Sequence, residues 1–285
     1  MLEIKNLDKS FGKLNVLNNL SAEFEDNKVY GLIGANGSGK TTLMKIISNH
    51  IPNYKGEVLF DGMNVTENQQ AISDIVYVGD GFPKAATTLS NKIDGIFKTV
   101  KLFRPDFDMD YALELLDKFK LSKKNKYKKL STGNKTIVEL IIGLASRAKL
   151  TIFDEPSSGL DAVNRYKFYS YLMEDLEKYP RTVIISTHII GEIENYLTDV
   201  KILNDGKFIL EDEVLNIQSR AYKVKDYEPA GKNIVARESI AGSKFYYVYD
   251  TLSEDEIKDI ELNMGTVSKV DLQRIFVAMI GGQNE

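Results

Sequence analysis

The first candidate site is a glycine-rich segment whose residue types and spacing suit the binding of phosphate. Residues 34–41 fit the pattern G-x-x-x-x-G-K-[ST], in which backbone N–H groups and a helix N-terminus cradle phosphate oxygens. Lys40 would reach the outer phosphates, and Thr41 would offer its hydroxyl to Mg²⁺. The predicted nucleotide-binding residues here are Gly34, Ala35, Asn36, Gly37, Ser38, Gly39, Lys40, Thr41 and Thr42. A glycine turn with an incidental lysine is the competing interpretation, which the flanking strand and helix patterns disfavour.

Two adjacent carboxylates form the second candidate site. Asp154 and Glu155 follow an apolar run that begins at Leu150, so they would lie beyond the carboxyl end of a buried strand. A carboxylate near Mg²⁺ stays ionised, which suits Asp154 as a metal partner through water, whereas Glu155 can accept a proton from an attacking water. An acidic turn before Pro156 is the alternative, and the presence of the phosphate loop makes it the weaker one.

A third segment carries the features of a helix N-terminus. Ser131 precedes an apolar run from Ile137 to Ala145, which makes it a natural N-cap of a long helix. Helix capping alone explains this segment when it is taken in isolation.

The elements around these segments alternate between strand and helix patterns. The predicted strands cover 2–4, 21–25, 29–33, 75–78, 150–153, 182–186 and 244–249. The predicted helices cover 41–48, about 162–179 and about 189–196, and two more begin near residues 253 and 271. Residues 83–147 show a mostly helical pattern, and Asn204-Asp205-Gly206 marks a hairpin turn.

This order predicts an α/β fold with several parts. We expect a P-loop NTPase core with a parallel sheet, an N-terminal antiparallel β subdomain, and a helical subdomain inserted at about 83–147. The core would cover residues 1–213, and residues 214–285 would form a small C-terminal α+β appendage.

Composition excludes several classes of protein. The 285 residues contain no cysteine, so disulfides and cysteine metal sites are absent. A net charge of −4 gives no basic field that would attract nucleic acid. No apolar run approaches the roughly 18 residues needed to span a bilayer, so we expect a cytoplasmic protein.

Together the motifs resemble those of the ABC ATPase family. That family's signature reads L-S-G-G-Q and lies between its phosphate loop and its Asp-Glu strand, as 130–134 do here. Ser131 and Gly133 match the signature, whereas Thr132 and Asn134 depart from its commonest form. The resemblance implies that Ser131 and Gly133 contact the γ-phosphate of ATP bound by another subunit.

The resemblance assigns further residues over about 1–213. Residues 158–161 resemble the D-loop at the dimer interface, and His188 resembles the switch histidine that contacts the γ-phosphate. Glu155 and His188 are the predicted catalytic residues. Phe11 resembles the aromatic residue that stacks on adenine, with a core phenylalanine as the alternative. Asp80 stands where the family usually has a metal-binding glutamine; the alternative is that it lies in a loop away from the metal.

The resemblance also implies a function and partners. The chain would be an exporter-like ABC transporter subunit that hydrolyses ATP with Mg²⁺ as a homodimer or heterodimer. It would bind a polytopic membrane permease through residues between Asp80 and about Lys101, and no nucleic acid. It would then be peripheral on the inner face of the cell membrane. A non-transport ABC ATPase acting as a soluble scaffold or regulator is the alternative.

A run of lysines precedes the signature segment. Its members are Lys118, Lys120, Lys123, Lys124, Lys126, Lys128 and Lys129. A solvated basic face is the simpler interpretation. Attraction to nucleotide or to anionic lipid is the alternative.

Overall fold

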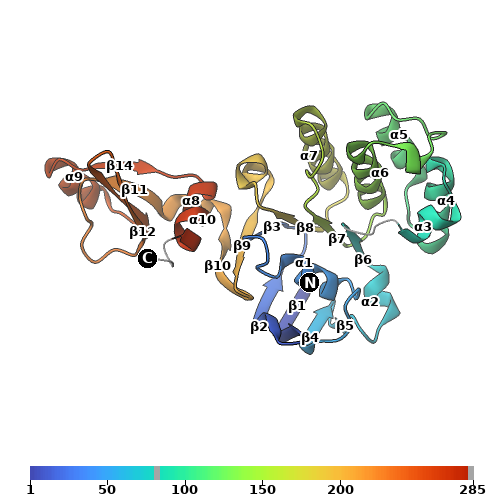
Figure 1. The fold of residues 1–285 in the computed structure, drawn as a ribbon, viewed down its shortest axis with the longest axis horizontal. Helices are drawn as coiled ribbons and strands as arrows, with labels where there is room; N and C mark the ends of the chain where they lie inside the picture. The colour runs from blue at the N-terminus through green and yellow to red at the C-terminus, as the bar shows by residue number, and fades with distance from the viewer. Residues whose placement is uncertain (80–83, 282–285) are drawn as a thin grey trace. The chain divides into compact units, whose positions relative to one another are not determined.

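A computed structural model of the chain describes residues 1–79 and 84–281. Its contacts divide the chain into two compact units, drawn in Figure 1. The first contains Met1–His188 and Leu203–Ile209, and the second contains Ile189–Ile202 and Leu210–Glu285. The predicted domain boundary near Glu213 stays a prediction.

The first unit begins with an antiparallel sheet in the order β2-β1-β4-β5. Its strands are β1 (Leu2–Phe11), β2 (Leu14–Phe24), β4 (Lys55–Phe60) and β5 (Met63–Asn64). Leu2 pairs with Phe24 on one side and with Phe60 on the other, and all three are buried. Alternation of apolar and polar residues thus gives this sheet one buried face.

A parallel sheet forms the centre of the first unit. It contains the order β3-β8-β7-β6, with β3 (Val29–Ile33), β8 (Thr182–Thr187), β7 (Leu150–Asp154) and β6 (Ile75–Val78). One face packs on α1 (Lys40–Ile47) and the antiparallel sheet, and the other on α6 (Thr132–Ala145) and α7 (Ala162–Lys178), as Figure 1 shows. Burial on both faces explains why these strands are continuous apolar runs.

Helices fill the segment between β6 and β7, as the sequence predicts. They are α3 (Lys84–Leu89), α4 (Ile93–Phe103), α5 (Met109–Lys118), the 3₁₀ turn η1 (Tyr127–Lys129) and α6, while the short α2 (Gln69–Ser73) precedes β6. Asp108 caps α5 by accepting a hydrogen bond from the Tyr111 N–H at 3.0 Å. Over residues 1–79 and 84–281, no helix has the length and apolar character that crossing a membrane requires.

Helix α6 packs closely on the parallel sheet because Gly143 has no side chain. A Cβ there would lie 2.6 Å from Val78 Cγ2 and 2.7 Å from Phe153 Cε1. The close contact fixes the helix that begins at the predicted signature segment against the strand that ends at Asp154.

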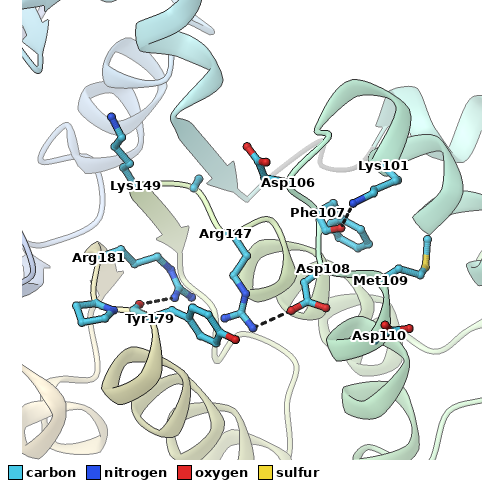
Figure 2. A pocket seen from close by; sticks show the side chains of 12 residues that line it. Lys101, Asp106, Phe107, Asp108, Met109, Asp110, Arg147, Lys149, Tyr179 and Arg181 are labelled. Carbon is cyan, nitrogen blue, oxygen red and sulfur yellow. Dashed lines mark hydrogen bonds and ion pairs between the residues drawn. The ribbon is translucent and has the colours of Figure 1, made fainter.

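An ion-pair cluster beside a hollow of about 620 Å³ joins the N-terminus of α5, the residues after α6, and α7 (Figure 2). Arg147 bonds to Asp108 and Asp175, and its guanidinium lies 3.8 Å from the centre of the Tyr179 ring. Arg181 bonds to the second oxygen of Asp175 at 2.6 Å. The hollow adjoins the residues that precede β7 and β8. It therefore lies where these strands begin, opposite the edge of the sheet at which Asp154 and Glu155 follow β7.

The second unit is built on the antiparallel sheet β12-β13-β11-β14. Its elements are η2 (Ile190–Glu192), η3 (Glu194–Tyr196), α8 (Val214–Arg220), β11 (Ala221–Lys225), β12 (Ile234–Ile240), β13 (Ser243–Tyr249), α9 (Glu254–Leu262), β14 (Thr266–Lys269) and α10 (Leu272–Gly281). The hairpin β9 (Asp199–Asn204) and β10 (Lys207–Glu213) lies partly in each unit. Asp205 and Gly206 both have positive φ, as the predicted two-residue turn requires.

The predicted helix from Ile189 to Tyr196 is wrong. This segment forms two 3₁₀ turns, η2 and η3. Gly191 lowers helix propensity, and the fully buried Ile190 and Ile193 are three residues apart, the spacing that a 3₁₀ turn aligns.

A partly buried hydrogen bond fixes η1 against α6. The Tyr127 hydroxyl donates to Glu139 Oε1, and burial is the main cause that raises the pKa of the Glu139 carboxyl. A carboxyl with a raised folded pKa stabilises the fold most when it is protonated. This contribution is complete below its ordinary pKa of 4.5 and is lost as pH rises through the folded value.

The substitution Glu139→Gln tests this coupling, because it keeps an oxygen acceptor for Tyr127 but cannot ionise. The free energy of unfolding of the wild type, minus that of the variant, should fall as pH rises above about 4.5. Urea unfolding at a series of pH values measures the difference. Glu177→Gln, at an exposed position on α7, is the control and should give a nearly constant difference. A constant difference for Glu139→Gln as well would contradict the prediction.

Candidate active site

The phosphate loop lies between β3 and α1, and its shape depends on glycine. A Cβ on Gly34 would lie 2.4 Å from the Leu203 carbonyl oxygen and 2.5 Å from Ser38 Oγ. Gly39 has a φ of 109°, which side-chain-bearing residues rarely adopt. The two glycines therefore allow the chain to turn tightly into the first residue of α1, Lys40.

Lys40 lies inside this turn. Its side chain is buried, and its Nζ donates to the carbonyl oxygens of Gly34 at 2.7 Å and Ala35 at 3.1 Å. Burial lowers the pKa of Lys40, while the charges of Glu155 and Asp154 act in the opposite direction. The ammonium group is thus held close to the loop, within the field of both carboxylates.

Ser38 supplies a direct indication that the loop suits an anion. Its Oγ is buried and has no hydrogen-bond partner among residues 1–79 and 84–281. An unsatisfied buried hydroxyl costs about 1–3 kcal/mol, and a phosphate oxygen could accept its hydrogen. The loop therefore fits the triphosphate that the sequence predicts.

Asp154 is held by two hydroxyl groups. Its Oδ1 accepts a hydrogen bond from Ser186 Oγ at 2.6 Å, and its Oδ2 accepts one from the Tyr77 hydroxyl at 2.9 Å. Parallel pairing places Ser186 opposite Asp154, and Tyr77 comes from the next strand, β6. Both carboxylate oxygens are therefore oriented by neighbouring strands.

Glu155 has an unusual backbone conformation at the end of β7. Its φ is 51°, in the left-handed region, which costs a non-glycine residue about 1–2 kcal/mol. Its N–H donates to both the carbonyl oxygen of Ser186, at 3.2 Å, and Ser186 Oγ, at 2.9 Å. Glu155 Oε2 lies 2.9 Å from Nδ1 of His188, so the structure brings the two predicted catalytic residues together.

The signature segment packs on the predicted D-loop. Ser131 caps α6 by accepting a hydrogen bond from the Asn134 N–H at 3.3 Å, as predicted. A Cβ on Gly133 would lie 2.7 Å from the carbonyl oxygen of Gly159, so glycine is needed there. Thr136 Oγ1 lies 3.4 Å from the Ser158 carbonyl oxygen. The two segments thus form one surface, which we call the signature surface (131–136 and 158–159).

The remaining predicted residues lie in different settings. The Phe11 ring is 49% exposed with the Lys9 ammonium 4.7 Å from its centre, so it is not a core residue. Thr41 is exposed and Thr42 is partly buried at the start of α1. Asp80 lies outside the described residues.

Sequence reasoning missed the residues that hold the carboxylates, Ser186 and Tyr77. Both are on predicted strands, and a parallel alignment of 150–154 with 182–186 would have paired Ser186 with Asp154. The sequence contains no motif that marks them.

Comparison with known proteins identifies the family. A family model described as ABC transporter matches residues 17–158. The lantibiotic transport ATP-binding protein SrtF of Streptococcus pyogenes is 33% identical over 218 residues, which cover 75% of this chain and 91% of that protein. The chain belongs to the ABC transporter ATPase family.

Two further ABC proteins resemble this chain, one by sequence over nearly its whole length and one by structure. The ABC transporter ATP-binding protein YtrB of Bacillus subtilis (strain 168) is 26% identical over 292 residues, 99% of each chain. The solved structure of an ATP-binding subunit of an ABC transporter superposes with a TM-score of 0.67 and 22% identity, covering 76% of this chain and 92% of that one. The predicted fold class and family are therefore confirmed, and the chain is an ABC ATPase.

Replacement of Ser186 tests whether its hydroxyl positions the carboxylates of Asp154 and Glu155. Ser186→Ala removes the donor to Asp154 Oδ1 and one acceptor of the Glu155 N–H. Loss of a hydrogen bond to a charged group costs about 1.5–3 kcal/mol, so ATP turnover should fall about tenfold or more. Phosphate release at saturating ATP measures the effect.

Thr151→Val is the matched control for this substitution. Thr151 is fully buried on β7, and its Oγ1 has no hydrogen-bond partner among the described residues. The control should retain turnover within about twofold. Equal turnover in both variants would show that Ser186 does not position the carboxylates.

Proposed function

We propose that this ABC ATPase powers export through a separate polytopic membrane permease and acts as a homodimer or heterodimer of ATPase subunits. The observation that carries the dimer in this proposal is the separation of two parts of one site. Among the described residues, no hydrogen bond joins Ser131 or Gly133 to the phosphate loop of the same chain. The exposed Ser131 is instead available to the phosphate loop of another subunit.

A twofold pair would complete two sites at once. Each phosphate loop would face the signature surface of the other subunit, so that the same contact forms twice. Ser131 and the N-terminus of α6 would then act on the γ-phosphate as a hydroxyl and a positive helix end. Thr132 adds a side chain beside this contact, but the N-cap geometry of Ser131 is intact.

Thr41 and Asp154 would hold Mg²⁺ beside the phosphates. Both oxygens of Asp154 already accept protein hydrogen bonds, which fits a carboxylate that holds a metal through water. The ion would neutralise phosphate charge. Asp80, the third predicted ligand, would add a further carboxylate to this set.

Glu155 and His188 would act on the attacking water and the γ-phosphate. Glu155 Oε2 is oriented by His188 Nδ1 and can accept a proton from water. His188 is 54% exposed at its side chain, so its other ring nitrogen can reach a ligand. Phe11 would stack on the adenine ring through its exposed face.

Glu155→Gln tests the composite site. The amide cannot accept the proton, so ATP should stay bound and the closed dimer should accumulate. Light scattering after size-exclusion chromatography in saturating ATP and Mg²⁺ should show a dimer for the variant and turnover reduced at least about a hundredfold. Glu174→Gln, on the surface of α7, should behave as the wild type. A monomeric Glu155→Gln protein with bound ATP would contradict the dimer model.

The permease would bind at the entry to the helical subdomain. Apolar side chains are exposed there, with Leu89 69%, Leu102 81% and Phe103 73% exposed. They lie at the ends of α3 and α4, within or directly after the segment that the family resemblance assigns to the permease. Leu102 and Phe103 are adjacent and both strongly exposed, which favours a protein contact. The subunit would then be cytoplasmic and peripheral on the inner face of the membrane.

Capture from detergent-extracted membranes tests the transport function. The tagged chain should retain a polytopic membrane protein, and Leu102→Glu should reduce its recovery about tenfold. Leu262→Glu is the control, because Leu262 is also a leucine near a helix end and is 84% exposed. Recovery of only a soluble complex would favour the scaffold or regulator alternative.

A further inference from the structure

Figure 1 labels α5 and α6, the helices on either side of the next charged segment. This segment carries a positive charge, opposite in sign to that of the whole chain. Residues 118–129 contain seven lysines and no acidic residue, although the chain has a net charge of −4. Lys118 pairs with Glu114 at 2.8 Å. Across residues 1–79 and 84–281, no ion pair joins the other six lysines to a carboxylate. We call residues 120–129 the lysine loop.

The lysine loop borders a hollow of about 550 Å³ with both apolar and cationic walls. The partly exposed Leu113 and the largely buried Leu116 and Leu121 form its apolar side. Lys120, Lys123 and Lys124 are exposed on its other side. Asp117 is the one carboxylate in the lining. A ligand that matches this hollow combines negative charge with apolar groups.

The main chain of the loop is tied to the start of α4. The Ile93 and Asp94 N–H groups donate to the carbonyl oxygens of Asn125, at 3.1 Å, and Lys123, at 3.0 Å. The Tyr127 N–H donates to the Asn91 carbonyl oxygen at 2.8 Å. Residues 91–94 belong to the segment proposed to face the permease, so the loop would lie toward the membrane. This step rests on the proposed function.

We propose that the lysine loop binds the anionic phospholipid headgroups of the membrane that holds the permease. Lysine ammonium groups on long flexible stems suit a fluid layer of phosphates, whereas a fixed bidentate site would favour arginine, which the loop lacks. Anionic lipid attracts nearby lysines additively, and salt screens the attraction. The partly exposed Leu113 beside the ammonium groups would contact the upper part of the acyl chains.

Vesicle flotation with the purified full chain tests the proposal without a permease. The protein should bind vesicles of phosphatidylcholine with one-third phosphatidylglycerol at least about tenfold better than phosphatidylcholine alone, and 0.5 M salt should remove most of the difference. The triple variant Lys120→Gln, Lys123→Gln, Lys124→Gln should bind anionic vesicles about tenfold or more weakly.

A charge-matched control separates this site from general electrostatic attraction. Lys55, Lys178 and Lys207 are exposed on other elements of the first unit, and their triple glutamine variant should bind as the wild type does. The proposal is overturned if the wild type ignores anionic lipid, or if the control loses as much binding as the loop variant.

Two further measurements on the triple variant of Lys120, Lys123 and Lys124 test whether the lysine loop instead binds nucleotide or an acidic protein surface. Its KM for ATP should be unchanged, and a tenfold rise with unchanged vesicle binding would assign the loop to nucleotide instead. Its permease capture in detergent should also be unchanged; loss of capture with unchanged vesicle binding would assign it to an acidic protein surface. If the wild type captures no permease but binds anionic vesicles through these lysines, the proposed function fails while the lipid site stands.

Discussion

The parallel pairing of β7 with β8 is the constraint on which the site depends. It places Ser186 opposite Asp154, where one hydroxyl both donates to Asp154 and accepts from the Glu155 N–H. The second interaction holds Glu155 in a left-handed conformation that its side chain would otherwise disfavour. The two adjacent carboxylates are thereby directed to different partners, Tyr77 for Asp154 and His188 for Glu155.

Local patterns in the sequence predicted the parts of this arrangement that depend on neighbouring residues. The phosphate loop, the Ser131 N-cap and the strand that ends at Asp154 each follow from a short run of residue types, and the structure has all three. Ser186 and Tyr77 could not be assigned in this way, because their role depends on which strands pair and in which register. The same limit explains the segment 189–196, where burial of two isoleucines overrides the helical pattern.

Glycine has two different functions in the site. At Gly34 the absent side chain lets the phosphate loop approach the carbonyl of Leu203, and at Gly133 it lets the signature segment approach the carbonyl of Gly159. The first contact shapes a surface that can bind phosphate. The contact at Gly133 packs the signature segment against the loop that follows Glu155. Because the two segments are in close contact, neither can move toward the other, so they must shift together.

The start of α4 is connected to the signature helix by a chain of polar contacts. Main-chain hydrogen bonds tie residues 91–94 to the lysine loop, and the Tyr127 hydroxyl at the end of that loop bonds to Glu139, two turns into α6. At the far end of α6, Arg147 bonds to Asp108 and Asp175. Loss of the Arg147 contact would leave the buried Asp175 with one ion-pair partner fewer, so the contacts favour motion of these helices as a unit. A force applied where the permease is proposed to bind would therefore reach Ser131 through α6.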